Sequence, residues 1–164
     1  MKILILALIA YSTSITTSIA GIDSWTSVSQ KDSFTAGKIV QVEYLCKYGT
    51  GQIKISCSDD YSGLLVSMLN GEAFGSPNLE EWPSLSIAVD GSVVFKRSPV
   101  NQEPYKISGI PTFLLSKEDS TKLASAFLTA TKQVALKNEG NKTTMLLSSN
   151  GSTEVGKQLL DCLN

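Results

Sequence analysis

Histidine is absent from the 164 residues of this sequence. Ser-His-Asp and Cys-His nucleophiles need an imidazole to move a proton near neutral pH, and zinc sites in exported proteins usually include histidine ligands. The absence excludes these hydrolase mechanisms and argues against zinc. We therefore predict no catalytic residue, no metal and no cofactor, while carboxylate-pair hydrolysis, Ser-Lys chemistry and thiol redox chemistry remain formally open.

An excess of one charge is also missing, because 14 basic residues are matched by 15 acidic ones. A near-neutral chain has no basic field to attract nucleic acid or an anionic membrane, and no acidic field for a cationic partner. We therefore expect no nucleic-acid partner.

A continuous apolar run opens the chain. Lys2 precedes the apolar residues 3–11, and Ser18-Ile19-Ala20 forms a small-residue cleavage site before Gly21. The run is about half of the ~20 residues that a spanning helix needs, so a membrane anchor is the less favoured alternative. We expect residues 1–20 to be a removable export signal, cleaved between Ala20 and Gly21, which leaves no stable membrane anchor.

Alternating apolar residues and turn signals predict that most of the chain is β-structure. The turn signals include Gly49-Thr50-Gly51 and Asp90-Gly91, and the second is a strong local signal for a hairpin. Pro111 favours an edge position or a break in the extended segment around it. Strands or extended segments are expected over residues 40–46, 53–57, 64–69, 85–89, 93–96, 105–115, 134–136 and 144–148.

Two segments have helical periodicity. The first begins at Ser116, which forms an N-cap pattern with Asp119. The second covers residues 152–163 and points Cys162 along its apolar stripe. The stripes consist of Leu123, Phe127 and Ala130 in the first helix and of Val155, Leu159 and Cys162 in the second.

Residues 21–164 are enough for one domain with a substantial core and too few for two comfortable ones. The order of the elements predicts an α+β fold that is mostly β. We expect a single antiparallel β-sandwich-like globular domain over 21–164 with a C-terminal helix, located in the periplasm or secreted.

Three cysteines in an exported chain leave one without an intramolecular partner. Cys46 shares a strand face with Tyr44, and Cys57 shares one with Ile55. If both faces look into one core, Cys57 lies opposite Val42 or Tyr44, and the two cysteines are at best diagonal neighbours. Diagonal neighbours are ~7–8 Å apart, beyond the ~4.4–6.8 Å that a disulfide tolerates.

Cys57 with Cys162 is therefore the favoured disulfide. Cys46 with Cys162 is the alternative pairing, and three buried free thiols are a further alternative. A redox function is less favoured, because the sequence has no Cys-x-x-Cys motif and apolar strand faces disfavour thiolates.

Two pairs of adjacent acids, Asp59-Asp60 and Glu80-Glu81, are the candidates for carboxylate chemistry. Glycoside hydrolysis uses two carboxyl groups placed across one bond, and hard cations also prefer carboxylates. Both pairs lie in turn-like segments, where adjacent acids are usually solvated loop charges. A carboxylate-based wall-glycan hydrolase is therefore kept as an alternative.

Four aromatic residues, Tyr61, Phe74, Trp82 and Tyr105, lie in or beside predicted loops. Aromatic side chains are enriched at protein contact sites, where they bury large areas. We name these residues as a candidate contact surface for a protein or a glycan. Packing at the edge of the core is the alternative.

Four short segments occur in an order that is shared with a known family. They are Trp25-Thr26-Ser27-Val28, Ile53-Lys54-Ile55-Ser56-Cys57, Val89-Asp90-Gly91 and Asp161-Cys162-Leu163. In this respect the chain resembles small bacterial exported proteins related to VasI, which are periplasmic accessories of type VI secretion systems. Cys46 and the segment 99–111 depart from the family pattern.

The resemblance implies a β-sandwich-like domain in which a Cys57–Cys162 disulfide clasps the C-terminal helix. It also implies a non-catalytic accessory that contacts a protein partner of the cell envelope or a secreted protein. An exported inhibitor of a lytic enzyme is an alternative, because small disulfide-clasped β domains present rigid loops. We expect a binding protein and not an enzyme.

Overall fold

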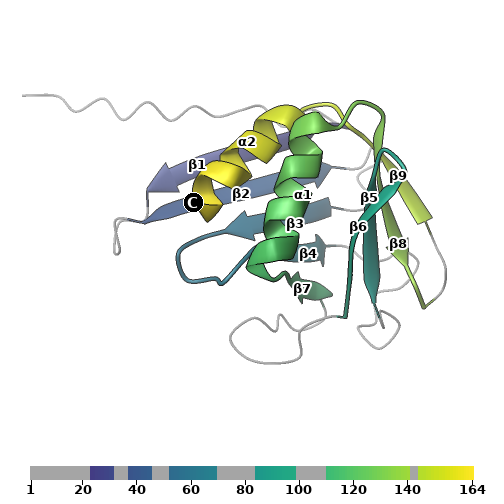
Figure 1. Cartoon of the computed structure of the whole chain (residues 1–164), viewed down its shortest axis with the longest axis horizontal. Coiled ribbons are helices and arrows are strands. Elements are labelled where there is room, and N and C mark those ends of the chain that lie inside the picture. The colour runs from purple at the N-terminus through teal and green to yellow at the C-terminus, as the bar shows by residue number, and fades with distance from the viewer. Residues whose placement is uncertain (1–22, 32–36, 46–51, 70–83, 99–109, 141–143) are drawn as a thin grey trace, which may run out of the picture.

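The computed structural model describes residues 23–31, 37–45, 52–69, 84–98, 110–140 and 144–164. Within these ranges the chain forms two antiparallel sheets and two helices (Figure 1), so the expected mostly β fold class is confirmed. The five-stranded sheet has the order β1-β2-β3-β4-β7, and the four-stranded sheet has the order β6-β5-β8-β9. The bounds are β1 Trp25–Lys31, β2 Lys38–Leu45, β3 Gln52–Cys57, β4 Leu65–Leu69, β5 Leu85–Val89, β6 Ser92–Arg97, β7 Thr112–Leu114, α1 Lys117–Thr129, β8 Gln133–Asn138, β9 Thr144–Ser148 and α2 Ser152–Leu163.

The two sheets are interleaved along the chain. The chain supplies β1 to β4 to the five-stranded sheet, leaves it for β5 and β6, returns with β7, and then adds β8 and β9 to the four-stranded sheet. Neither sheet is therefore built from one continuous stretch of sequence. The buried residues of both sheets and both helices form one hydrophobic core.

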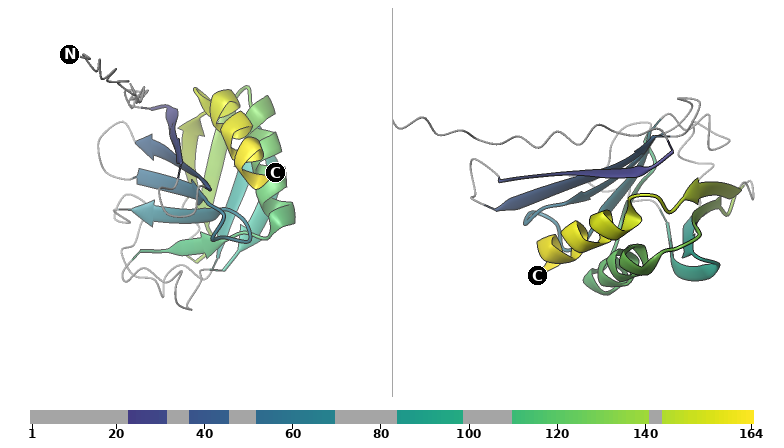
Figure 2. Two further views of the ribbon diagram at one scale, coloured as in Figure 1. Left: turned by 90° about the vertical axis from the view of Figure 1, so that its left-hand side faces the viewer. Right: turned by 90° about the horizontal axis from the view of Figure 1, so that it is seen from above.

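Both helices lie on the same face of the five-stranded sheet and beside the four-stranded sheet (Figures 1 and 2). α2 contacts β1, β2 and β3, whereas α1 contacts α2 and β6. The helices approach closely at Gly156, where a Cβ atom would lie 2.4 Å from the backbone nitrogen of Leu128. Trp25 packs against Tyr44 and Phe127, with ring centroids 4.9 Å and 4.7 Å away.

Local sequence signals set several element boundaries as expected. The Ser116 hydroxyl accepts a hydrogen bond from the backbone N–H of Asp119 at 3.1 Å, which confirms the N-cap of α1. Asp90 and Gly91 have φ angles of 50° and 87°, and two positive φ angles are what a type I′ hairpin turn requires. The last helix and β9 have the predicted bounds.

The register between β2 and β3 differs from the expectation. Cys57 lies opposite Val40, so the expected partners, Val42 and Tyr44, are wrong. The premise that the apolar faces of both strands look into one core is correct. The connection between the strands is longer than the assumed tight reversal, and this moves the partner of Cys57 toward the start of β2.

Two other segments differ from their expected structure. Trp25–Lys31 forms β1, although no element was expected there, because its residues are mostly polar and the apolar alternation is weak. Within the expected extended segment 105–115, Thr112–Leu114 is the described strand, and the segment up to residue 109 lies outside the described residues. This strand is at an edge of its sheet, as Pro111 predicted.

Candidate functional site

A disulfide joins Cys57 at the end of β3 to Cys162 in the last turn of α2, with their Cα atoms 6.4 Å apart. The bond confirms the favoured pairing and ties the last helix to the central strand of the five-stranded sheet. Cys57 is buried, whereas Cys162 is half-buried. Cys46 lies outside the described residues.

A surface hollow of about 340 Å³ opens beside this disulfide. It brings together three features that the sequence singled out, namely the disulfide, Asp59 and Tyr61. Hydroxyl and charged side chains dominate its wall, so the hollow suits polar groups more than an apolar ligand. The lining residues are Cys57, Ser58, Asp59, Tyr61, Ser62, Lys117, Cys162, Leu163 and Asn164.

Most other predicted site residues fall outside the part of the chain that the structure describes. Asp60 is the exception, and it is exposed beside Asp59. In the described residues, no three His, Cys, Asp or Glu side chains are grouped so that they could hold a metal ion. The residues that lie outside are Ala20, Gly21, Phe74, Glu80, Glu81, Trp82 and Tyr105.

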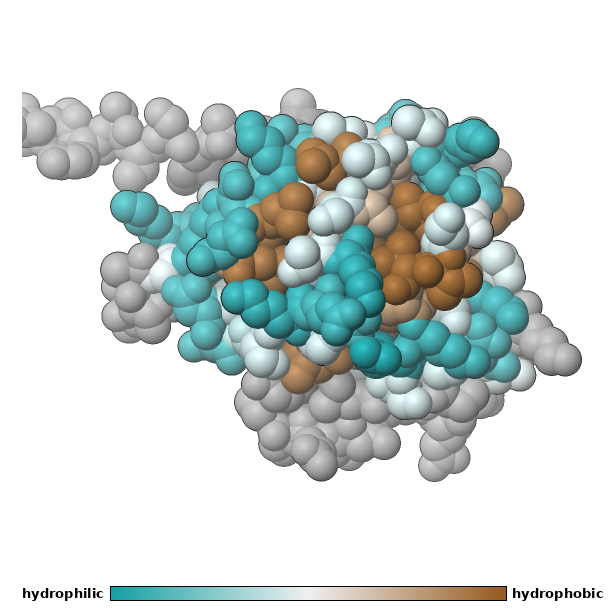
Figure 3. All heavy atoms as spheres, viewed as in Figure 1, coloured by the Kyte–Doolittle hydropathy of each residue, from teal (hydrophilic) through white to brown (hydrophobic). Residues whose placement is uncertain are grey.

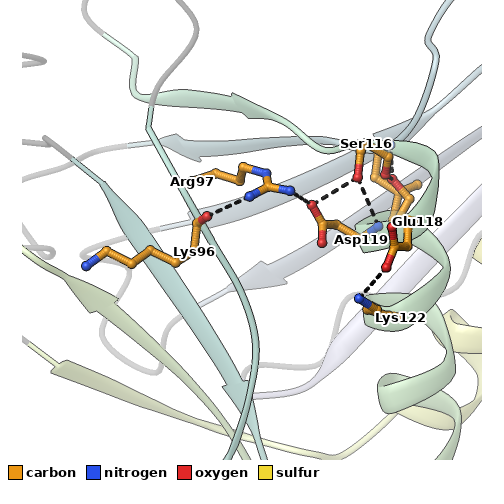
Figure 4. A network of polar contacts seen from close by, with 8 residues as sticks. Lys96, Arg97, Ser116, Glu118, Asp119 and Lys122 are labelled. Atoms are coloured by element: carbon orange, nitrogen blue, oxygen red, sulfur yellow. Dashed lines mark hydrogen bonds and ion pairs between the residues drawn. The ribbon is translucent and has the colours of Figure 1, made fainter.

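A charged network connects β6 to the start of α1 (Figure 4). The Arg97 guanidinium pairs with the carboxylate of Asp119, which also accepts a hydrogen bond from the Ser116 hydroxyl at 3.0 Å. Glu118 pairs with Lys122 one turn along the helix at 2.6 Å. Acids in the first turn of a helix interact favourably with its dipole. The Arg97–Asp119 pair therefore links α1 to the four-stranded sheet, while Ser116 caps the start of the helix and holds Asp119 in place.

The outward face of the four-stranded sheet carries a row of apolar side chains. Val93 of β6 pairs with Ala88 of β5, Ala88 pairs with Ala135 of β8, and Ala135 pairs with Leu146 of β9. Directly paired residues share one face of a sheet, and the alternate residues of β5 and β8 are buried in the core. We call these four residues the apolar row. Val93 and Leu146 at its ends are 71% and 64% exposed. Apolar residues also gather beside this sheet on the right of Figure 3, which views the sheet nearly edge-on.

A polar row runs beside the apolar row and consists of Lys96, Ser86 and Lys137 on paired strands. Glu139 accepts hydrogen bonds from the Ser86 hydroxyl at 2.7 Å and from the Lys137 amine at 3.1 Å, and the Lys96 amine is 3.8 Å away. The Ser86 hydroxyl and Lys137 hold the pKa of Glu139 below its usual value. The ionised carboxylate therefore offsets part of the positive charge on this face.

Asp90 fastens the hairpin that carries Val93 to the start of β8. Its carboxylate accepts hydrogen bonds from the backbone N–H groups of Thr131, Lys132 and Gln133 at 2.8, 2.8 and 2.9 Å. The Thr131 hydroxyl adds a fourth bond at 3.1 Å. These bonds, led by the one from Gln133, lower the pKa of Asp90 to about 2. The ionised carboxylate thus stabilises one end of the face that bears the apolar row.

The sequence did not predict the apolar row, although the alternation pattern of one of its strands was present. The expected strand over residues 85–89 has Leu85, Ile87 and Val89 in alternation, and this pattern implies that Ala88 faces outward. Ala88 meets Ala135 only because β5 pairs with β8, more than forty residues later in the chain. Such long-range pairing has no local signature, so the row could not be assembled from the alternation pattern.

Comparison of the chain with protein families, with curated proteins and with solved structures found no match. Of the helices in the described ranges, none is long and apolar enough to cross a membrane.

Proposed function

We propose that this protein is a non-catalytic exported binding protein that acts through protein–protein contact. The apolar row across the four-stranded sheet is the observation that carries the proposal. Contiguous exposed apolar side chains with a polar rim are typical of protein contact sites. Val93 and Leu146 would gain most from a partner, because water reaches more of their surface than of the two alanines between them.

The shape and charge of this face favour a protein partner over a small molecule. Small-molecule sites are concave, whereas the apolar row lies on the open face of a sheet. Protein interfaces place charged groups at the rim and keep them out of the centre. Lys96, Lys137 and Glu139 lie to one side of the row and are paired with one another, which matches this arrangement.

The Cys57–Cys162 disulfide supports an exported location, because disulfides persist in oxidising compartments and are rare in the reducing cytoplasm. The expected signal at residues 1–20 agrees with it. We therefore propose that the protein acts in the periplasm or outside the cell. The resemblance to VasI-related proteins further suggests an accessory role in the cell envelope, with an envelope or secreted protein as the partner.

The experiment is capture from an extract of the native cell envelope by the mature chain, residues 21–164, with chemical cross-linking. A Val93→Lys/Ala135→Lys variant places two charges in the apolar row and should recover the partner at least about tenfold less efficiently. The matched control is Gln41→Lys/Ser56→Lys, because these residues are also paired on the outward face of adjacent strands, in the other sheet. The control should capture the partner as the wild type does.

Equal capture by both variants would reject the apolar row as the contact site. Release of peptidoglycan fragments by the purified protein would contradict a non-catalytic role, provided that it is lost in the variant Asp59→Asn/Asp60→Asn/Glu80→Gln/Glu81→Gln. Capture of a lytic enzyme whose activity is suppressed would replace the accessory role with that of an inhibitor.

A further inference from the structure

The two edges of the four-stranded sheet are built differently. The β6 edge carries Lys96 and Arg97, and its register with β5 shifts between Ile87 and Ala88. Charges and such bulges protect sheet edges from pairing with other chains. The β9 edge has the sequence Thr-Met-Leu-Leu-Ser, with no charge and no proline, and its register with β8 is continuous. β9 itself therefore carries no charge, proline or bulge that would protect its edge.

Hydrogen bonds at Ser148 show which backbone groups of β9 point away from β8. The Ser148 N–H donates to the Tyr44 hydroxyl at 3.0 Å, and the Ser148 carbonyl accepts from the Trp25 indole at 2.9 Å. Gln133, which lies opposite Ser148, uses its own N–H and carbonyl to bind Asp90, at 2.9 Å each. Ser148 and Gln133 are therefore a pair that is not hydrogen-bonded to each other.

Antiparallel ladders alternate between hydrogen-bonded and non-hydrogen-bonded pairs. Ser148 is in a non-hydrogen-bonded pair with β8, so Leu146 and Thr144, which lie two and four residues before it, are in such pairs as well. Their N–H and carbonyl groups therefore point away from β8. The outward groups of Ser148 are already used by Tyr44 and Trp25. Within β9, Thr144 and Leu146 are thus the residues whose outward groups a further strand can use.

We propose that a second copy of this chain pairs with β9, so that two four-stranded sheets join into one continuous sheet across a two-fold axis. In one antiparallel register the outward groups of one copy face those of the other. Thr144 of each copy then lies opposite Leu146 of the other, and Met145 lies at the axis. Each of these pairs exchanges two hydrogen bonds, which uses the four outward groups of Thr144 and Leu146 in each copy. A register centred on Leu146 would instead bring Thr144 opposite Ser148, whose groups are occupied.

The side chains at the seam also suit a second copy. β9 has no charged residue, so the two-fold contact brings no like charges together. Leu146, which is largely exposed in the single chain, is covered by Thr144 of the other copy. Two-fold dimers are the commonest closed assemblies of identical chains. This dimer does not depend on the proposed function, although it would present two apolar rows on one surface.

The first test is sedimentation equilibrium of the mature chain with its disulfide intact, from about 1 µM to about 1 mM. The wild type should dimerise, and Leu146→Pro should weaken the dimer at least about tenfold. Proline removes an N–H that points away from β8, so the ladder within the copy is retained. Val93→Lys is the matched control, because it changes an exposed aliphatic residue on the opposite edge and should leave the dimer intact.

The second test needs no change to the backbone hydrogen bonds. In the proposed register the two Met145 Cα atoms are ~4.5 Å apart, as in non-hydrogen-bonded pairs, and this distance is within the range that a disulfide spans. Met145→Cys in a Cys46→Ser background should therefore form a covalent dimer on mild oxidation. Val93→Cys in the same background should not. A wild type that is monomeric at every concentration, a folded Leu146→Pro variant that dimerises normally, or failure of the Met145→Cys chains to cross-link would each overturn the proposal.

Discussion

The hydroxyl of Tyr44 accepts a hydrogen bond from the backbone N–H of Ser148 at 3.0 Å, and this bond joins β2 of one sheet to β9 of the other. The same hydroxyl donates to the carboxylate of Asp23, while the Trp25 indole binds the Ser148 carbonyl. Two aromatic residues of the five-stranded sheet thus satisfy both backbone groups of one residue in the four-stranded sheet. The corner where the sheets meet is held by directed bonds as well as by apolar packing.

Tyr44→Phe should lower the free energy of unfolding by about 1–3 kcal/mol, because it leaves the Ser148 N–H without its acceptor in a largely buried site. The ring stays in place, so no cavity contributes to the loss. The measurement is urea unfolding of the oxidised protein. Thr26→Val is the control, because it removes a hydroxyl that donates to the Glu43 carbonyl at 3.4 Å on the partly exposed side of the same sheet. It should lower the free energy of unfolding by about 0.5 kcal/mol or less. An equal loss in both variants would show that the Tyr44–Ser148 hydrogen bond stabilises the fold no more than a surface hydrogen bond does.

Removal of the Cys57–Cys162 disulfide should lower the free energy of unfolding by about 4 kcal/mol, because the bond closes a loop with a sequence separation of 105 residues. The measurement compares unfolding with and without a phosphine reductant. The reductant should destabilise the Cys46→Ser variant as much as the wild type and should leave Cys57→Ala/Cys162→Ala unchanged. A reductant effect that is abolished by Cys46→Ser would contradict the pairing.

Stability should decline as the pH falls from about 4 to about 2, in part through Asp90. The pKa of Asp90 is about 2 in the folded chain against an ordinary value of 3.8, so its ionised form stabilises the fold above pH 4. That contribution is lost as the pH falls toward 2. Asp90→Asn should therefore be less stable than the wild type at neutral pH and should show a shallower decline between pH 4 and 2. Thr131→Val, which removes one of the four bonds to this carboxylate, should flatten the decline less.

Gly156→Ala should destabilise the protein by about 1–3 kcal/mol, the usual cost of overpacking. In an exposed helix the same change would stabilise by about 1 kcal/mol, because glycine is a poor helix former. Here a Cβ atom would lie 2.4 Å from the nitrogen of Leu128 and 2.6 Å from the carbonyl oxygen of Ala124, and backbone atoms of α1 cannot move aside cheaply. Thermal unfolding decides the sign, with the exposed neighbour Lys157→Ala as a control that should shift stability by about 0.5 kcal/mol or less.

Elements with strong local signals were predictable from the sequence. The N-cap at Ser116, the turn at Asp90-Gly91 and the apolar stripe ending at Cys162 all depend on residues close together in the chain. Strand phase ruled out the nearer pairing, Cys46 with Cys57, and favoured the Cys57–Cys162 disulfide that the structure shows, although it left Cys46–Cys162 open as an alternative. The strand β1 was missed because its stability comes from pairing with β2 and from burial of Trp25 under the helices, and neither leaves a periodic pattern.

The apolar row could not be predicted from the sequence, for a related physical reason. Its four residues come from four strands, and their alignment depends on the pairing of β5 with β8. The outward backbone groups of β9 that remain for another strand also depend on the other sheet, because Tyr44 and Trp25 already bind those of Ser148. Alternation within a strand states which side chains share a face, but it does not state which strand lies next to it.

Cys57 and Cys162 are 105 residues apart in the sequence, so the ribosome makes them at clearly different times. At ~5–20 residues per second, synthesis delivers the second cysteine roughly 5 to 20 s after the first. An oxidase that joins thiols in their order of appearance would meet Cys46 and Cys57 long before α2 exists, and the bond it made would be a wrong one. Correct maturation therefore requires either that oxidation waits for the complete chain or that another thiolate, of Cys162 itself or of an isomerase, attacks the early bond and exchanges it for the final one.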